Sequence, residues 1–269
     1  MKYLLWNIYG KNLIGPLIQV IIENEIDVVA LIETKKIELD TVINQLNLKG
    51  CRWKKLEFCP NADIRLIVKD EINVSIHCEE KHYNTYKIKQ NEELLLLTVV
   101  HLSSAMYKSE EARSSRAEDV SNVIRKIEEE LFGENEYKSI VIGDFNLQPY
   151  SRGIIGAYGF NATMSIIKAK KVSWTVDGEK KLFYFNPTWK IMGDNKNVQG
   201  SYYNNSDQDD KAVFWYSFDE VLIRPSLIDR FIWNNFVIIE ETKDHKFIRN
   251  EIIDKNNYSD HLPVKFEII

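Results

Sequence analysis

The chain has 269 residues, of which 44% are hydrophobic and 28% are charged, and its formal net charge at pH 7 is −5. This length and balance are typical of a soluble protein with one large domain or two small ones and a substantial core. The acidic net charge argues against a protein whose whole surface binds nucleic acid. It leaves nucleic acid open as a substrate, because local patches can steer it.

The three cysteines, Cys51, Cys59 and Cys78, form no CxxC motif, and their odd number leaves one thiol over in any pairing. Free thiols in a reducing compartment are therefore the favoured interpretation. Asn7 and Lys11 interrupt the apolar start of the chain, and no segment approaches the roughly 20 apolar residues that a membrane span requires. We expect a cytoplasmic protein without a membrane span, and the sequence identifies no protein partner.

The first 50 residues alternate short apolar runs with amphipathic segments. Residues 2–6 predict a strand, and apolar side chains at helical spacing over residues 14–22 predict a helix. The continuous apolar run at residues 27–32 predicts a strand covered on both faces. A second helix is expected over residues 39–46.

The middle of the chain is predicted to contain several successive strands and then a long helix. Short polar turns separate four predicted strands, at residues 64–69, 72–77, 83–89 and 94–100. The long helix is indicated by an apolar stripe made of Val120, Val123, Ile124, Ile127 and Leu131. The remaining predicted strands are residues 139–142, 217–223 and 264–268.

Helices that alternate with runs of strands favour two sheets packed on each other with helices outside. Because no repeat, Pro-rich linker or low-complexity tract divides the chain, we expect a single domain over residues 1–269. Residues 159–216 are the least regular part, and we expect an insertion with long loops there.

Side chains that can bind a metal or transfer a proton stand where the apolar runs begin or end. They are Asn7, Glu33, His101, Asp144, Asn146, Asp219, Asp260 and His261. Strand ends deliver side chains to the rim of a sheet, and the spacing of Asp144 and Asn146 places both on one side. One such residue alone is usually a turn residue or a cap. The joint pattern is what indicates a functional site.

Oxygen atoms are the ligands that Mg²⁺ prefers, usually from one or two carboxylates together with water and substrate phosphates. Glu33, Asp144 and Asp260 have this chemistry. Asn7 and Asn146 are neutral, so they can bond a phosphate oxygen or orient a ligand without adding repulsion. No Gly-rich phosphate loop, HExxH motif or zinc-finger spacing is present, which argues against P-loop and zinc chemistry.

Six segments, in order, resemble the endonuclease/exonuclease/phosphatase family, which includes relatives of pancreatic deoxyribonuclease and of the exonuclease-III-type abasic-site endonucleases. The segments are LLWNIYGKN, DVVALIETK, VVHLSS, IVIGDFNLQP, FDEVLI and SDHLPV. They are spread over nearly the whole chain, and GDFN followed by a C-terminal SDH is a specific combination. The resemblance implies a four-layered α/β sandwich, with two packed mixed β-sheets flanked by helices.

The resemblance also implies roles at the metal and the phosphate for five residues. Glu33 resembles the main metal-binding glutamate, and Asp260 contributes to the same site. Asn7 and Asn146 resemble the amides that contact metal, water or phosphate. Asp144 resembles the aspartate that binds the metal or activates the attacking water.

For the histidines, the resemblance implies contacts with the phosphate. His261 resembles the histidine that contacts the scissile phosphate, and Asp219 resembles the carboxylate that orients it. His101 stands where family members place a His or Tyr near the phosphate. Such a set suits water attack on a phosphodiester, with a metal and an imidazole stabilising the developing negative charge.

These residues predict a phosphoesterase that uses Mg²⁺, for which Mn²⁺ could substitute. The favoured interpretation is a nuclease acting on DNA or RNA. A phosphatase or phosphodiesterase for a small-molecule or lipid phosphate is the alternative, and a phosphate-binding pseudoenzyme is a further one. The pseudoenzyme is disfavoured because every expected catalytic side chain is present.

The predicted insertion is rich in aromatic residues, with lysines interleaved. Aromatic faces beside cations suit the stacking of bases in single strands, and Trp174 and Trp189 are the candidates for this contact. The alternative is that the aromatic residues form the core beneath a long insertion, because large aromatic side chains dominate buried area. The sequence leaves both interpretations open.

Overall fold

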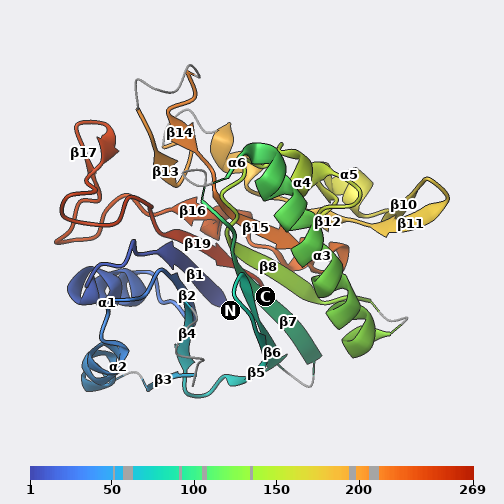
Figure 1. The fold of residues 1–269 in the computed structure, drawn as a ribbon. Coiled ribbons are helices and arrows are strands. Elements are labelled where there is room, and N and C mark those ends of the chain that lie inside the picture. Colours follow the sequence, from blue (N-terminus) through green and yellow to red (C-terminus); the bar gives the residue numbers. More distant parts are fainter. Residues whose placement is uncertain are drawn as a thin grey trace.

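The fold comes from a computed structural model, which describes residues 1–50, 52–56, 63–90, 93–104, 108–133, 136–193, 198–205 and 212–269 (Figure 1). Cys51 and Cys59 lie outside these residues. Cys78 is a free thiol whose pKa is raised by burial. Within the described residues, the helices are too short or too polar to cross a membrane.

The first sheet has the strand order β16-β19-β1-β2-β4-β3. Its strands are β1 (Lys2–Asn7), β2 (Val28–Ile32), β3 (Trp53–Lys55), β4 (Ile64–Lys69), β16 (Val237–Ile238) and β19 (Val264–Glu267). β1 and β2 are parallel, and β19 runs antiparallel to β1. The helices α1 (Ile14–Glu23) and α2 (Leu39–Leu48) cover the outer face, because their buried apolar residues join those of β1 and β2 in one cluster.

The second sheet has the strand order β5-β6-β7-β8-β15-β12-β9. Its strands are β5 (Asn73–Glu79), β6 (Tyr83–Gln90), β7 (Glu93–His101), β8 (Ser139–Asp144), β9 (Ala162–Thr163), β12 (Tyr184–Phe185) and β15 (Asp219–Ile223). β7 and β8 are parallel, and β15 runs antiparallel to β8. The long helix α3 (Glu110–Phe132) and the short α4 (Arg152–Ile155) pack on its outer face.

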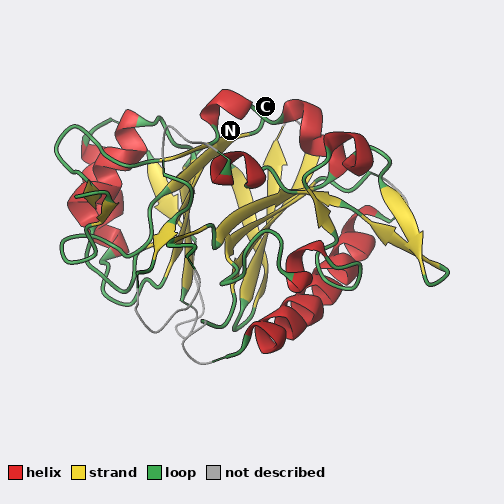
Figure 2. Cartoon of the chain, turned by 90° about the horizontal axis from the view of Figure 1, so that it is seen from above, coloured by secondary structure: helices red, strands yellow, loops and turns green. Residues whose placement is uncertain are grey.

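A third apolar cluster lies between the sheets and contains residues from both. Successive side chains of a strand point to opposite faces, so β15 turns Val221 and Ile223 toward this central core and Leu222 toward α3. Figure 2 shows the two groups of strands in the middle and helices on either side. The predicted four-layered arrangement of two packed mixed sheets is confirmed.

The predicted strands and helices are all present, although several bounds differ. The helix α3 begins ten residues before the predicted stripe, at Glu110, where the Ser109 hydroxyl accepts a hydrogen bond from the amide of Ala112. Val123 was expected in the apolar stripe, but it is 38% exposed. The stripe is narrower than predicted, because the buried residues Val120, Ile124 and Ile127 follow the i, i+4, i+7 spacing and Val123 lies at its edge.

Several short elements were not predicted. They are β10 (Ser173–Val176), β11 (Glu179–Leu182), β13 (Tyr202–Tyr203), β14 (Trp215–Tyr216), β17 (Ile248–Arg249), β18 (Ile252–Ile253), α5 (Ile166–Ala169), α6 (Trp189–Met192), and the 3₁₀ helices η1 (Pro225–Arg230) and η2 (Trp233–Asn235). β3, β9, β12, β16 and α4 were not predicted either. β9 and β12 lie in the segment expected to be loops, which therefore supplies strands of the second sheet, and its Phe183, Tyr184 and Phe185 are buried. For these three aromatic residues, the core interpretation holds.

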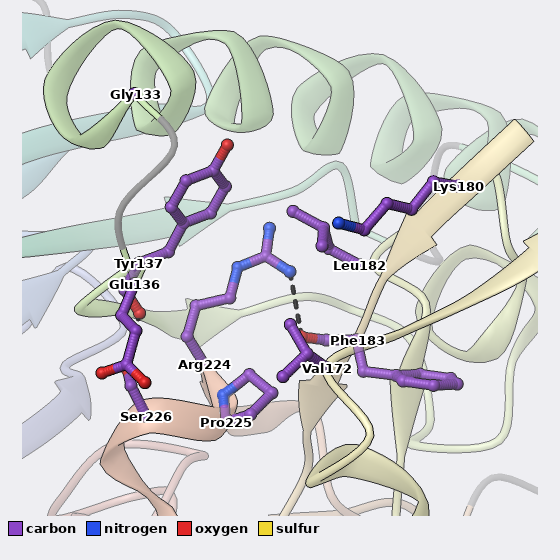
Figure 3. A pocket seen from close by; sticks show the side chains of 10 residues that line it. All are labelled: Gly133, Glu136, Tyr137, Val172, Lys180, Leu182, Phe183, Arg224, Pro225 and Ser226. Carbon is purple, nitrogen blue, oxygen red and sulfur yellow. Dashed lines mark hydrogen bonds between the residues drawn. The ribbon is translucent and has the colours of Figure 1, made fainter.

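Two buried polar side chains lie on the outer side of β15. One of them belongs to Arg224, directly after the strand, and the protein supplies partners for its charge and its hydrogen-bond donors. Its guanidinium forms a two-pronged ion pair with Glu128 of α3 and donates to the Phe183 carbonyl at 2.9 Å. The ring of Tyr184 lies 3.7 Å from the guanidinium carbon. Figure 3 shows Arg224 on the wall of a pocket of about 560 Å³ with Tyr137 and Phe183. A buried pair of this kind is tolerated because its charges are matched and hydrogen-bonded.

Glu220 is the second buried polar residue, and one of its oxygens has no hydrogen-bond partner among the described residues. Its other oxygen accepts a bond of 2.6 Å from the Asn186 amide. Burial raises the pKa of the Glu220 carboxyl well above its usual range, although the Asn186 bond opposes this shift. The folded protein therefore favours the protonated acid.

This raised pKa predicts a pH-dependent stability. In the unfolded chain the Glu220 carboxyl has a pKa of about 4.3, and below this pH both the folded and the unfolded protein hold the proton. Burial of the neutral acid destabilises the folded state least. As the pH rises toward the folded pKa, only the unfolded state loses the proton, so the fold is destabilised. The Glu220→Gln variant lacks this titration, and its free energy of unfolding relative to the wild type should rise from about pH 5 to about pH 8.

Urea unfolding at several pH values measures this difference, with Glu130→Gln as the control because Glu130 is an exposed residue of α3. A stability difference that stays constant with pH would contradict the assignment.

Candidate active site

The predicted metal and catalytic residues lie at one rim, where strands of both sheets end or begin. β1 ends at Asn7, β7 at His101 and β8 at Asp144, and β15 begins at Asp219. The register places both His101 and Asp219 opposite Asp144 on the two neighbouring strands of β8. Glu33 follows β2 directly, and Asp260 and His261 lie just before β19.

Asn7 connects the two sheets within the site. Its amide nitrogen donates to Oδ2 of Asp144 at 3.0 Å and to Oε1 of Glu33 at 3.2 Å. Asn7 and Glu33 belong to the first sheet side, whereas Asp144 ends a strand of the second. One neutral donor therefore holds two carboxylates that would repel each other, and a carboxylate in this place could not do so.

Glu33 has a left-handed backbone, with φ of 56°. The conformation is rare for a residue with a side chain and costs on the order of 1–3 kcal/mol. The Glu33 carbonyl accepts a hydrogen bond from Gly10 at 2.8 Å, which fixes the turn. Strain of this kind persists at functional sites, where it sets the direction of a side chain.

Three hydrogen bonds hold Asn146 in place, and one of them is to Asp144. Its backbone amide donates to Oδ1 of Asp144 at 2.9 Å, and its side-chain nitrogen donates to the Leu102 carbonyl at 3.0 Å. The Arg113 guanidinium, from the first turns of α3, donates to the Asn146 carbonyl. With its nitrogen occupied by Leu102, the Asn146 side chain keeps its oxygen for other contacts.

His261 lies between two aspartates. Its Nδ1 is 2.7 Å from Oδ2 of Asp219, and its Nε2 is 3.8 Å from Oδ2 of Asp144. Burial alone would lower the pKa of the imidazole, but the charges of Asp219 and Asp144 outweigh burial and raise it to about 10. Ser259 fixes the backbone of the histidine, because its hydroxyl accepts from the His261 amide at 3.1 Å and donates to the Asn7 carbonyl at 2.6 Å.

The carboxylates fit a divalent cation. Donor atoms of Glu33, His101 and Asp144 all lie within 4.8 Å of one another. Asp260 is not part of this group, but its charge interacts with that of Glu33, and Oδ1 of its carboxylate is buried and accepts no hydrogen bond from the described residues. Burial raises the pKa of Asp144 to about 6, and burial together with the charge of Glu33 raises the pKa of Asp260. Crowded acids with an orphaned oxygen are the donor set of a hard cation.

Trp174 and Trp189, the predicted stacking residues, are not brought together. Trp174 lies on the β10–β11 hairpin, stacks on Phe183 and donates to Asn161. Phe183 lines the pocket of Arg224, which follows the end of β15 opposite to Asp219. Trp189, at the start of α6, contacts Tyr150 with ring centroids 6.2 Å apart. Trp189 thus flanks the loop that follows Asn146, and Trp174 lies at the far end of the sheet.

Solved structures share this architecture along nearly the whole chain. TDP2 from Caenorhabditis elegans aligns with 99% of this chain and 73% of its own, with a TM-score of 0.59 and 15% identity. The endonuclease domain of TRAS1, a telomere-specific non-LTR retrotransposon, aligns with 99% of this chain and 97% of its own, with a TM-score of 0.56 and 11% identity. The sequence matches no protein-family model and no curated protein.

A mannosyl-6-phosphatase from Bacteroides thetaiotaomicron aligns with 100% of this chain and 99% of its own, with a TM-score of 0.55 and 12% identity. The chain has the deoxyribonuclease I-like fold. The fold implied by the six sequence segments is therefore confirmed. At these low identities the deoxyribonuclease I-like structures establish the architecture alone, and the roles of the rim residues stay predictions.

Three residues that the sequence analysis did not assign also belong to this rim. Ser259 was quoted only as part of the SDH segment, although it ties His261 to Asn7. Ser201 donates to Asp219, and the ring of Tyr202 lies 4.9 Å from the imidazole of His261. Ser201 and Tyr202 come from the predicted insertion, and no strand pattern pointed to them.

The arrangement predicts that Glu33 contributes to cation affinity without supporting the fold. Glu33→Gln removes a charged donor, so Mn²⁺ should bind at least about tenfold more weakly, since even indirect partners of a ligand cost that much. Thermal stability without metal should stay the same or rise, because the variant relieves repulsion among the acids. Titration calorimetry and thermal melts measure both quantities. Glu38→Gln, at an exposed position next to α2, is the control, and equal affinities in the two variants would refute the role of Glu33.

Proposed function

We propose that this protein is a metal-dependent phosphoesterase, and more specifically a nuclease that hydrolyses phosphodiester bonds of DNA or RNA with Mg²⁺, or Mn²⁺ in its place. One observation carries the proposal. His261 is clamped between Asp219 and Asp144 at the same rim as the acids Glu33 and Asp260. A fixed imidazole beside a cation site suits phosphoryl chemistry, because both can stabilise the negative charge that develops.

Glu33, Asp144 and Asp260 would hold the cation. A bound Mg²⁺ would neutralise negative charge on the phosphoryl and leaving oxygens. The buried oxygen of Asp260 supports this assignment, because an unpaired buried acceptor is costly unless a partner binds it. His101 lies 3.6 Å from Glu33 through Nε2, a position from which it can contact the phosphate beside the acids.

His261 would donate a hydrogen bond to a phosphoryl oxygen. Its Nδ1 is committed to Asp219, so only Nε2 faces the rim. The aspartate fixes the tautomer and the ring orientation and stabilises the charged imidazolium, as a carboxylate does for the histidine of hydrolytic triads. The raised pKa of His261 keeps the ring protonated at neutral pH.

Asp144 would accept a proton from the attacking water. Its pKa of about 6 leaves a carboxylate at neutral pH, yet a more basic one than an ordinary aspartate. The amides of Asn7 and Asn146 hold its two oxygens in place. In-line attack would then expel the leaving oxygen on the side opposite the water.

The charges near the rim favour a diester with a single charge per phosphate over a highly phosphorylated small molecule. Three of the cations near the site residues have protein partners. Lys11 donates to the carbonyl of Tyr258, Lys35 pairs with Asp63 at 3.5 Å, and Arg113 donates to Asn146. The endonuclease domain among the similar structures supports this choice.

A substrate panel tests the proposal. Plasmid DNA, single-stranded DNA, RNA, cyclic dinucleotides and inositol phosphates are incubated with Mg²⁺ or Mn²⁺, and each reaction is repeated with excess EDTA. Cleavage of a nucleic acid that EDTA abolishes is expected. Hydrolysis of sugar or inositol monoesters alone would favour the phosphatase alternative, in line with the mannosyl-6-phosphatase of the same fold. Full activity in EDTA would exclude the metal role.

The clamp of His261 predicts non-additive effects of two substitutions. His261→Ala should lower kcat by about 10²–10⁴, the contribution of an acid–base group, while Mg²⁺ affinity stays nearly unchanged. Asp219→Asn should cause similar damage and add little in the double variant, because the two residues act as one unit. His101→Ala should have a smaller effect.

Steady-state kinetics of the two single variants and the double variant at saturating Mg²⁺ measure the coupling. His77→Ala, on β5, is the matched control. Losses that simply multiply would show that Asp219 does not act through His261.

A further inference from the structure

The strand β13, in the aromatic-rich segment, lies beside His261. Tyr202 forms an isolated antiparallel bridge with His261, and the amide of Leu262 donates to the carbonyl of Ser201 at 2.7 Å. The backbone that carries His261 is therefore paired on one side with the residues before and within β13. The same segment touches Asp219, which lies on a different strand.

Ser201 forms two hydrogen bonds with Asp219. Its hydroxyl donates to Oδ2 of the carboxylate at 2.5 Å and accepts from the Asp219 amide at 3.3 Å. The same Oδ2 receives Nδ1 of His261 at 2.7 Å. The other oxygen, Oδ1, is buried and has no partner among the described residues. Within that part of the chain, Ser201 and His261 thus determine how the carboxylate is turned.

Close packing keeps the hydroxyl in place. Ser201 is 1% exposed. A Cβ on the preceding Gly200 would lie 2.5 Å from the carbonyl oxygen of Tyr216, so the backbone there approaches β14 as closely as only glycine permits. The ring of Tyr202 lies 4.9 Å from that of His261 and 5.4 Å from that of Phe218. These contacts leave the serine little freedom to turn away from Asp219.

We propose that Ser201 is a positioning residue that fixes the Asp219 carboxylate and, through it, the tautomer and orientation of His261. The hydroxyl occupies one lone pair of Oδ2 and directs the other toward Nδ1–H. Nε2 is then aimed at the rim. The effect of Ser201 on turnover rests on the proposed hydrolytic role of His261. The effect of Ser201 on the Nδ1 hydrogen bond does not rest on that role.

Two matched variants separate this role from a merely structural one. Ser201→Thr keeps the hydroxyl and adds one methyl group. Ser201→Val adds the same methyl group and has a second one in place of the hydroxyl, so the two variants have nearly the same shape. Ser201→Ala removes atoms only, which covers the case in which the larger residues do not fold. Ser217→Ala is the control, because Ser217 is also buried and its hydroxyl ties the same segment at the Gln199 carbonyl, away from Asp219.

Turnover of bis(4-nitrophenyl) phosphate with Mn²⁺ is the first measurement. Ser201→Ala and Ser201→Val should lower kcat about 10- to 100-fold, which corresponds to one lost hydrogen bond to a charged group. KM and Mn²⁺ affinity should change little, and the threonine variant should keep more activity than the valine variant. In an Asp219→Asn background, Ser201→Ala should add almost nothing. Equal losses for threonine and valine, or a full additional loss in that background, would overturn the proposal.

The second measurement needs no substrate. In protein labelled with ¹⁵N-histidine, the Nδ1–H resonance of His261 is identified by its loss in His261→Ala. It should shift in the alanine and valine variants and stay in place in Ser201→Thr and Ser217→Ala. An unchanged resonance in all four would overturn the proposal even if the wild type hydrolyses no diester. A shifted resonance in an inactive wild type would instead uphold the positioning role and refute the proposed function.

Discussion

The amide of Asn7 donates to two carboxylates from opposite sheets, and the arrangement of the rim depends on this one bridge. Glu33 and Asp144 would repel each other at this distance without a donor between them. The amide supplies that donor without adding charge, so the cluster stays open to a cation. It also links the end of β1 to the end of β8, beside the apolar core that packs the two sheets together.

The strand β15 and the residue after it show two ways to hold charge inside a protein. At its end, Arg224 is fully paired with Glu128, and the pair is hydrogen-bonded throughout. At its beginning, Oδ1 of Asp219 has no hydrogen-bond partner in the part of the chain that the structure describes, and the acids Asp144 and Asp260 have raised pKa values. In the Arg224–Glu128 pair, the protein itself occupies the hydrogen-bonding groups that could otherwise bind a ligand. The second arrangement keeps unsatisfied acceptors, which is costly for folding and suited to binding.

The sequence could predict the strand ends because they combine local signals. A continuous apolar run predicts a buried strand, and the polar residue at its end marks the rim of the sheet. Asn7, His101 and Asp144 could therefore be placed at the rim from the sequence alone. The contacts of Ser201 could not be found in this way. They join residues 18 positions apart through a segment with no regular pattern, and Ser201 is an ordinary loop residue by composition. The left-handed backbone of Glu33 was also invisible, because no local rule demands it.

The aromatic-rich segment illustrates the same limit from the other direction. Its composition suggested either rings that stack on bases or rings that form a core. Composition does not determine where each ring lies. Phe183, Tyr184 and Phe185 are buried, Trp174 lies beyond the far end of β15, and Tyr202 packs against His261. The stacking roles of Trp174 and Trp189 stay predictions. The aromatic surface that adjoins the imidazole comes instead from β13 and β14, whose Tyr202 and Tyr216 contact Phe218 just before Asp219. The two-stranded sheet of β13 and β14 thus lies beside both His261 and the residue that precedes Asp219.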